Sequence, residues 1–377
     1  MNYSYWEHDS YFNSVDLAII GGGIVGLNAA IAAKESNPAL KVVVIEKGVV
    51  LMGASLRNAG FACFGSPSEL IDDLKTRSAE QVFKLVEKRW KGLLALRSLI
   101  GDKAMEYEGL GGYELFDTED SFKESVEAIA GFNKEISAIT GEKETYRVTD
   151  EKINQFGFKG FSHMLENRCE GQLNTGKMIR ALISKAAEAD VILMNGLEVK
   201  DFKEEQDGVL ISTSWQSFKA KHILFTTNAY TSQLLKDVEV KPARAQVLIT
   251  APIEGLKMKG AFHYDKGYYY FRNVGQRVLF GGGRNLDFEG ETTTELETTD
   301  KIQSALEKML SEKIIPGIHY KVEHRWSGIM GLGVGDKSPI VKTISPRVHC
   351  AVRLGGMGVA IGTLVGQEAA AMVLQQL

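Results

Sequence analysis

A glycine-rich turn between two apolar segments constrains the fold of this chain more than any other feature. Gly21, Gly23 and Gly26 stand in G-x-G-x-x-G spacing, between the apolar run Val15–Ile20 and a helix-like run, Ile24–Ser36. Such glycines let the chain turn sharply off a strand, let the backbone approach a pyrophosphate, and let the helix pack against the sheet. The N-terminus of the helix offers N–H groups and positive potential to the phosphates. We therefore predict a strand–turn–helix unit that binds a dinucleotide.

A second apolar run supports the same interpretation. Residues 42–46 end in Glu46, which stands 20 residues after Gly26. An acid at this distance can accept hydrogen bonds from a ribose hydroxyl of the dinucleotide. The alternative is a glycine-rich turn without a ligand. A strand, the three glycines, a helix, a second strand and the acid together favour the binding site.

Composition and charge narrow the class of protein. The chain has 377 residues and a net charge of -4 without a basic block, which argues against a nucleic-acid surface. No apolar run reaches the roughly 18 residues that span a bilayer, and residues 1–9 lack the pattern of a secretory signal. The three cysteines show no pairing pattern or metal-ligand spacing. We expect a cytoplasmic protein with reduced thiols, no bound metal and no membrane or nucleic-acid partner.

Two further segments favour FAD over NAD as the dinucleotide. The loop at residues 53–61 is rich in small and polar residues, which suits a long ligand that passes close to the backbone. The segment Gly355-Gly-Met-Gly-Val-Ala places a second glycine turn before a helix near the end of the chain. Its N–H groups can stabilise negative charge that develops on the pyrimidine ring of a flavin. An NAD-dependent dehydrogenase has no need for this second turn.

The distribution of these features predicts interleaved domains. The 7 prolines form no linker, and nucleotide-domain features occur near the start, the middle and the end. Alternating runs at 246–251, 268–272 and 277–280 indicate an antiparallel sheet between them. We predict an α/β protein in which a Rossmann-like FAD-binding domain is interleaved with an α+β substrate domain. The expected segments are 13–90, 165–240 and 325–377 for the FAD-binding domain and 91–164 and 241–324 for the substrate domain.

These motifs resemble the D-amino-acid oxidase superfamily of flavoenzymes, which includes glycine oxidase and sarcosine oxidase. The resemblance covers nearly the whole chain. Its matching pieces are the first glycine turn with Glu46, Gly53-Ala-Ser-Leu-Arg-Asn-Ala-Gly, Glu170-Gly-Gln-Leu-Asn, Arg325-Trp-Ser-Gly and the terminal glycine turn. Within the superfamily, Ser4-Tyr-Trp and Tyr270-Phe-Arg-Asn are most similar to the γ-glutamylputrescine oxidase-like branch.

The resemblance implies FAD bound in an extended conformation. The glycine turn would face the pyrophosphate, Glu46 would bind the adenosine ribose, and Val199 would contact adenine through its backbone. The terminal turn would close over the flavin. The cofactor-binding residues that the resemblance implies are Gly21, Gly23, Ile24, Val25, Gly26, Glu46, Lys47, Ser55, Arg57, Asn58, Ala59, Val199, Thr227, Asn228, Gly328, Gly356, Met357, Gly358 and Val359.

The chain departs from the family pattern where relatives bind a carboxylate. Amino-acid-oxidising members carry an arginine after Trp-x-Gly, and Met330 occupies that position here. Glycine oxidase has a second arginine at about the position of Gly356, and the branch has histidine in place of Met357. Arg272 and Arg353 could replace the missing arginines. The alternative for Arg272 is an exposed strand residue, and the alternative for Arg353 is a structural arginine that caps strand-end carbonyls. The candidate substrate-site residues are Arg57, Tyr270, Arg272, Met330 and Arg353.

The implied reaction is hydride transfer from a C–H beside an amine to flavin N5, followed by imine hydrolysis. The flavin supplies this chemistry, so we expect no catalytic triad. The small-molecule substrate would be an amine or amino acid, oxygen or another acceptor would reoxidise the flavin, and the protein could be a homo-oligomer. The alternatives are a flavin dehydrogenase of a hydroxy acid or polyol, and a flavin-binding protein without catalysis.

Overall fold

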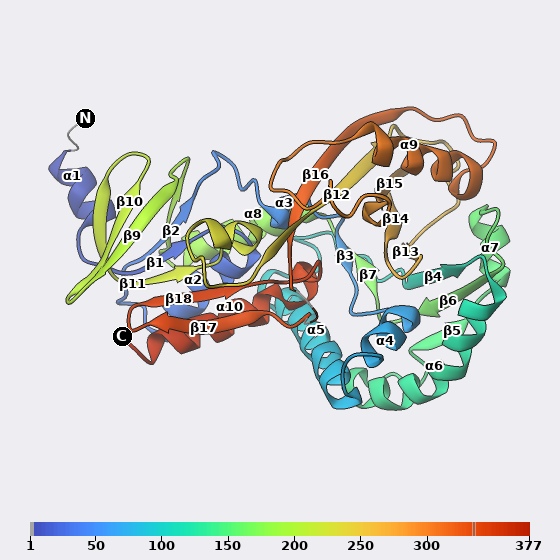
Figure 1. The fold of residues 1–377 in the computed structure, drawn as a ribbon, viewed down its shortest axis with the longest axis horizontal. Helices are drawn as coiled ribbons and strands as arrows, with labels where there is room; N and C mark the ends of the chain where they lie inside the picture. The colour runs from blue at the N-terminus through green and yellow to red at the C-terminus, as the bar shows by residue number, and fades with distance from the viewer. Residues whose placement is uncertain (1–3, 334, 336) are drawn as a thin grey trace.

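Two large sheets occupy separate halves of an elongated molecule in the computed structural model, which describes residues 4–333, 335 and 337–377 (Figure 1). The first sheet has eight strands, with the order β17-β18-β11-β1-β2-β8 and with β10 and β9 attached to β11. Its strands are β1 (Val15–Ile20), β2 (Val42–Glu46), β8 (Ile192–Asn195), β9 (Val199–Glu205), β10 (Gly208–Thr213), β11 (Ser217–Phe225), β17 (Ile340–Ser345) and β18 (Val348–Val352).

The centre of the first sheet is parallel and buried on both faces. β1 pairs in parallel with β2 and β11, and β11 pairs in parallel with β18. Leu17 and Ile19 face one apolar core, whereas Ala18 and Ile20 face the other. This double burial explains the continuous apolar runs of these strands. The first core holds α2 (Ile24–Ser36), α5 (Ala79–Ile100), α8 (Thr175–Glu188) and α10 (Gly358–Leu374).

The second sheet has eight strands in the order β16-β12-β15-β14-β13-β4-β6-β5. All of its neighbouring strands are antiparallel except β4 and β13, which are parallel. One face packs on α9 through a row of paired residues, Phe262, Phe271 and Phe280. Its elements are β4 (Gly112–Phe116), β5 (Tyr146–Val148), β6 (His163–Asn167), β12 (Lys241–Thr250), β13 (Ala261–Tyr264), β14 (Tyr269–Val274), β15 (Arg277–Gly282), α9 (Asp300–Met309) and β16 (Val322–Leu332).

The chain crosses between the two sheets several times, as the interleaved arrangement requires (Figure 1). The expected boundary at residue 325 falls inside β16, and the boundary at 165 falls inside β6. Both strands pair within the second sheet. We therefore propose that the last nucleotide-domain segment begins after Leu332 and that the middle segment begins after Asn167.

Shorter elements connect the sheets. Residues 67–100 fold as two helices, and the second begins at a capping box in which Ser78 and Gln81 bond each other's backbone N–H groups. The remaining elements are α1 (Tyr5–Glu7), η1 (His8–Phe12), α3 (Ala54–Arg57), β3 (Phe61–Ala62), α4 (Pro67–Leu74), α6 (Glu119–Thr140), α7 (Glu151–Phe156), β7 (Gly171–Gln172), η2 (Asn228–Gln233), η3 (Arg284–Leu286) and η4 (Leu310–Ile314).

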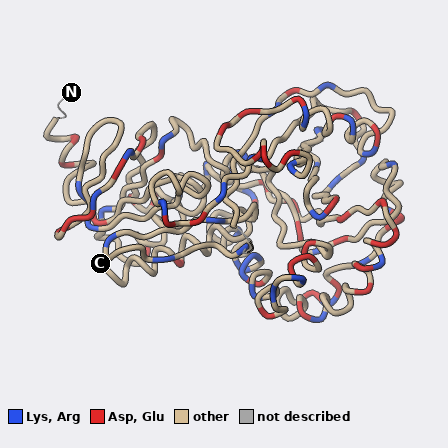
Figure 2. The backbone as a smooth tube through the Cα atoms, viewed as in Figure 1, with Lys and Arg blue, Asp and Glu red and all other residues tan. Residues whose placement is uncertain are grey.

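Charged residues of both signs are interspersed over both halves of the molecule (Figure 2). Within the described residues, none of the helices combines the length and the apolar character that crossing a bilayer requires.

Candidate active site

A cavity of about 1010 Å³ connects the first glycine turn with the face of the second sheet that α9 does not cover. Its lining includes Gly21 and Glu46 from the first half and His263 and Tyr270 from the second. Such a volume is large enough for an extended cofactor together with a small substrate. The cavity is therefore the candidate active site.

The first glycine turn has the close approaches that its spacing predicts. A Cβ on Gly26 would lie 2.0 Å from the carbonyl oxygen of Gly21, so only glycine lets α2 pack this tightly on the end of β1. Gly21 has a φ of 110°, which favours glycine. The backbone N–H of Ile24, the first residue of α2, donates to Ser55 Oγ at 2.9 Å. Gly26 does not line the cavity, because it is buried in the helix–strand contact.

Glu46 stands at the carboxyl end of β2, where the parallel strands open onto the cavity. Its two carboxylate oxygens accept N–H bonds from Gly22 at 3.0 Å and from Gly48 at 2.9 Å. These bonds hold the carboxylate beside the glycine turn. Val199, at the start of β9, lines the same end of the cavity.

The loop that follows β2 is held to both halves of the molecule. Arg57 donates to the carbonyl oxygens of Met52 at 3.0 Å and Ser327 at 2.9 Å. In return, Trp326 Nε1 donates to the carbonyl oxygen of Arg57 at 2.9 Å. Asn58 is fixed by its own amide, which donates to the carbonyl of Ser55 at 2.9 Å. Arg57 therefore lines the cavity as a structural tie between the loop and β16.

The terminal glycine turn joins β18 to α10. Gly355 and Gly356 adopt φ values of 59° and 81°, and Arg353 adopts 67°, which is uncommon for a residue with a side chain. Asn228 Oδ1 holds the turn by accepting N–H bonds from Arg353 at 3.1 Å and Leu354 at 3.3 Å. Arg353 Nε donates to the carbonyl of Ser338 at 2.9 Å, and Arg353 does not line the cavity.

Arg272 is also directed away from the cavity. It is 6% exposed, and its guanidinium donates to three backbone carbonyls, those of Ala59, Asn273 at 3.1 Å and Leu173 at 2.9 Å. Burial lowers its pKa to about 10. This geometry argues against Arg272 as a substrate ligand, because its donors are already used to join the second sheet to the loops of the first half.

The predicted cofactor residues other than Gly26 all line this one cavity. They are Gly21, Gly23, Ile24, Val25, Glu46, Lys47, Ser55, Arg57, Asn58, Ala59, Val199, Thr227, Asn228, Gly328, Gly356, Met357, Gly358 and Val359. Met330 and Tyr270 line it as well. Of the five candidate substrate residues, the structure thus brings together three and leaves Arg272 and Arg353 outside the lining.

The strand register places a row of residues on the cavity face of the second sheet. His263 pairs with Tyr270, Tyr270 pairs with Gly281, and Gly281 pairs with Val247. Directly paired residues project from the same face of a sheet. A Cβ on Gly281 would lie 2.6 Å from the Tyr270 ring, so glycine makes room for the ring beside it. Burial raises the pKa of Tyr270, which keeps its hydroxyl neutral.

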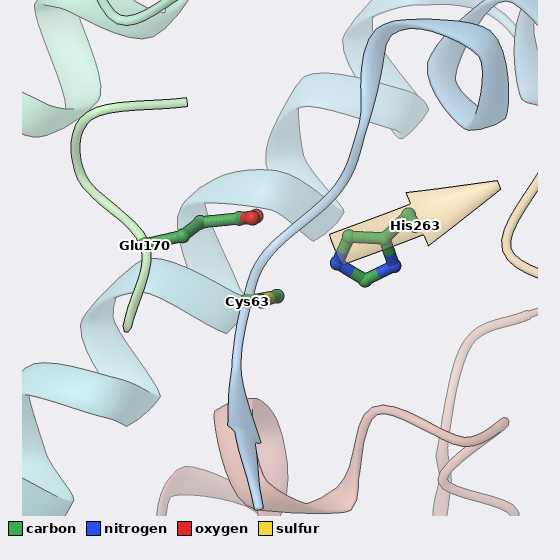
Figure 3. Close-up of side chains that lie close together, drawn as sticks. All are labelled: Cys63, Glu170 and His263. Atoms are coloured by element: carbon green, nitrogen blue, oxygen red, sulfur yellow. The ribbon is translucent and has the colours of Figure 1, made fainter. Parts of the chain in front are cut away.

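Three polar side chains converge at one end of this row, and sequence spacing does not reveal them. Cys63, Glu170 and His263 line the cavity, with ligand-type atoms within 4.8 Å of one another (Figure 3). Burial raises the pKa of Glu170 to about 7, although N–H bonds from Phe64 at 2.8 Å and Gly65 at 3.2 Å oppose the shift. Burial, followed by the charge of Glu170, raises the pKa of the Cys63 thiol. Their sequence spacing gives no metal-ligand signal, because only the fold brings the three residues together.

Cationic side chains also line the cavity. Arg284 follows the glycine run at the end of β15, and its guanidinium lies over the Phe288 ring, 5.0 Å from the ring centroid. Burial lowers its pKa, and its Nε has no hydrogen-bond partner within the described part of the chain. Lys266, whose Nζ lies 3.4 Å from Asp72, lines the cavity too. Sequence reasoning missed Arg284, and the preceding glycine run was its only local signal.

The first half of the molecule is Rossmann-like and carries the glycine turn and the acid. The second sheet closes the cavity that both halves line. This arrangement is typical of an enzyme that uses a dinucleotide. The family described as "DAO: FAD dependent oxidoreductase" matches residues 16–372. The chain therefore belongs to this family of FAD-dependent oxidoreductases. The γ-glutamylputrescine oxidase-like branch within it stays a prediction.

Individual relatives agree with this family. The chain is 24% identical over 380 residues to "Probable oxidoreductase OrdL" of Rhizobium meliloti (strain 1021), covering 95% of this chain and 83% of that protein. It is 24% identical over 281 residues to glycine oxidase of Geobacillus kaustophilus (strain HTA426), covering 71% of this chain and 69% of that protein. The solved structure of L-proline dehydrogenase from P. horikoshii has a TM-score of 0.76 at 17% identity, covering 96% of this chain and 94% of that one. This structural likeness shows a shared fold.

Proposed function

We propose that this enzyme oxidises the C–N bond of a small amine that also carries a carboxylate. The observation that carries the proposal is that carboxyl groups and cationic side chains line one cavity. Glu170 and Glu69 provide the carboxyl groups, and Arg284 and Lys266 provide the cationic side chains. A zwitterionic substrate satisfies both groups, whereas a simple amine satisfies only the carboxylates.

The names of two relatives support this substrate class. Glycine and L-proline, in the names glycine oxidase and L-proline dehydrogenase, each carry an amine and a carboxylate. In amino-acid-oxidising members of the family, the resemblance implies a carboxylate-binding arginine after Trp-x-Gly, and Met330 occupies that position here. We propose that Arg284 takes over this role from a different strand end, because its planar guanidinium suits a carboxylate.

The protein residues would position the substrate, and FAD when bound supplies the hydride acceptor. Arg284 would pair with the substrate carboxylate. Glu170 would accept a hydrogen bond from the amine, which directs the amine-bearing carbon inward. Tyr270 and Met330 would exclude water and keep the reacting C–H in an apolar surrounding.

Anaerobic reduction of the FAD-loaded enzyme tests the proposal. Matched pairs should be compared, each an amino acid and the same amine without its carboxylate or with an amidated one. We expect the amino acid to bleach the flavin absorbance at lower concentration than its partner. Reduction by hydroxy acids or polyols, with amines and amino acids inactive, would instead support the dehydrogenase alternative. Reduction by none of these classes would contradict the proposal.

A further inference from the structure

The cluster of Cys63, Glu170 and His263 is assembled from three distant parts of the chain. Cys63 follows β3, Glu170 precedes β7, and His263 lies in β13. One sulfur, one carboxylate oxygen and one ring nitrogen lie within 4.8 Å of one another (Figure 3). Because the fold brings together three different ligand types in the lining of a cavity, the cluster has a composition that a metal ion recognises.

Two of the three side chains are held in place by the surrounding backbone. Cys63 is 4% exposed and Glu170 is 2% exposed. Glu170 Oε1 receives the N–H groups of Phe64 and Gly65, which follow Cys63 directly. The same short segment therefore carries the thiol and fixes the carboxylate.

His263 is the adjustable member of the cluster. Its ring contacts Phe61 edge-on with centroids 5.2 Å apart, and it projects from the sheet beside Tyr270. Its ring nitrogens make no hydrogen bond to any described residue.

Charges of both signs lie near the cluster. Glu69 acts electrostatically on both Cys63 and Glu170. Arg89 donates to the carbonyl of Phe64, and the charge of Arg272 acts on Cys63. A cation held by the three ligands would be attracted by Glu69 and repelled by Arg272, so the ligand atoms themselves carry the proposal.

We propose that Cys63, Glu170 and His263 form a binding site for one transition-metal ion of the Zn²⁺ class. A thiolate, an imidazole and a carboxylate are the ligands that Zn²⁺ combines, and alkaline-earth ions do not select sulfur. Tetrahedral bonds of about 2.0–2.3 Å place ligand atoms roughly 3.5 Å apart, so separations of up to 4.8 Å must shorten by at most about 1.3 Å. Rotation of His263 can supply this contraction. All three residues line the cavity, so water or another ligand can complete the coordination from that side.

Binding involves no change of oxidation state. The Cys63 S–H bond breaks, a sulfur–metal bond forms, and the proton leaves to solvent. In this position the ion would replace the substrate ammonium beside Glu170, so it would compete with the substrate of the proposed function. Metal binding itself does not rest on that function, and binding is measured without turnover.

Metal content of the FAD-loaded protein tests the proposal. Chelator-treated protein is dialysed against buffered Zn²⁺ and analysed for bound metal. We expect about one ion for each chain, and at least tenfold weaker binding in Cys63→Ala and in His263→Gln. The matched controls are Cys350→Ala, a buried cysteine in β18, and His324→Gln, an exposed histidine in β16. These controls should bind Zn²⁺ as the unchanged protein does.

Replacement by Co²⁺ adds a readout of the ligands. We expect d–d bands at wavelengths beyond the flavin absorption, and their loss in Cys63→Ala. Stoichiometry well below one, or equal Zn²⁺ binding in both ligand variants, would overturn the proposal. If Cys63→Ala fails to fold, which its flavin content would show, the His263→Gln variant decides the outcome, because His263 is only half-buried. Failure of the amino-acid panel with intact Zn²⁺ binding would overturn only the proposed function.

Discussion

The sulfur of Met330 lies 3.3 Å from the position that a Cβ on Gly356 would occupy. These are the two positions at which amino-acid-oxidising relatives are expected to carry arginines. The two missing arginines would therefore have extended from one shared corner of the cavity, between β16 and the terminal turn. Met330 and Gly356 offer no cation there, so the proposed substrate carboxylate would be bound from elsewhere in the lining.

Replacing Arg284 tests whether it supplies that binding. Arg284→Gln should raise the KM for a carboxylate substrate about 10- to 100-fold, because one charged hydrogen-bonding partner contributes about 1.5–3 kcal/mol. The KM for the matched amine without a carboxylate should change little. Steady-state kinetics on both members of the pair measure the difference.

A control for this variant is available on the far side of the same sheet. Arg325 donates to Gln303 at 2.7 Å and to Glu307 at 2.8 Å in α9 and does not line the cavity. Arg325→Gln should leave both KM values unchanged. Equal rises in KM for the two substrates in Arg284→Gln would show that the arginine does not recognise the carboxylate.

Arg272 should behave as a structural residue. Arg272→Lys keeps the charge but replaces a planar fork that serves three carbonyls with a single ammonium group. We expect the free energy of unfolding to fall by about 2–4 kcal/mol, because buried carbonyls lose their partners. Denaturant titration measures this loss. A KM that rises only for carboxylate substrates, with stability unchanged, would assign Arg272 to substrate binding instead.

The cofactor half of the site could be predicted because its signals are local. The glycine spacing, the flanking apolar runs and Glu46 lie within one short segment, and the close approach of Gly26 to Gly21 confirms the role of the third glycine. A capping signal was also present at Ser78 and Gln81, where a continuous helix-forming stretch divides into α4 and α5. Local chemistry of this kind is readable without knowledge of the tertiary fold.

The substrate half could not be predicted in the same way. In the sequence, Glu170 lies about 100 residues from both Cys63 and His263, and those two are about 200 residues apart. The parallel pairing of β13 with β4 and the register of β13 on β14 place His263 at the cavity. Arg272 and Tyr270 share a strand face, as alternation requires. Nevertheless, Tyr270 meets the cavity while Arg272 meets backbone carbonyls. Long-range packing decides such differences.

The third glycine of the first turn should not tolerate a methyl group. Gly26→Ala would place a Cβ 2.0 Å from the Gly21 carbonyl oxygen and 2.8 Å from Thr226 Oγ1, so α2 must move away from β1. We expect loss of FAD binding together with lower stability, measured by flavin content and thermal unfolding.

The matched control is a glycine in a helix with open space around it. Gly131 lies in α6, and a Cβ there would meet nothing within 4 Å. Gly131→Ala should retain FAD and gain about 0.5–1 kcal/mol, because alanine favours helix and restricts the unfolded chain. Full flavin content in Gly26→Ala would contradict the proposed packing role of that position.

A buried histidine pair in the first sheet should make stability depend on pH. His222 Nδ1 lies 3.1 Å from His349 Nε2, and both residues are almost fully buried. Burial and the neighbouring His222 lower the pKa of His349 to about 4. Between pH 6.5 and 4 the unfolded chain therefore binds a proton that the folded chain does not, so the stabilising contribution of neutral His349 is lost as the pH falls.

The effect is isolated by comparing the protein with His349→Gln, because other groups that titrate in the same range act on both. Burial raises the pKa of Glu114 to about 7, for example, and its contribution changes with pH in the opposite direction. The stability difference between the two proteins should shrink by up to about 3 kcal/mol from pH 7 to pH 4, following about 1.4 kcal/mol for each pKa unit. Denaturant unfolding at several pH values measures it. A difference that stays constant would mean that His349 titrates normally in the folded protein and that water reaches the pair.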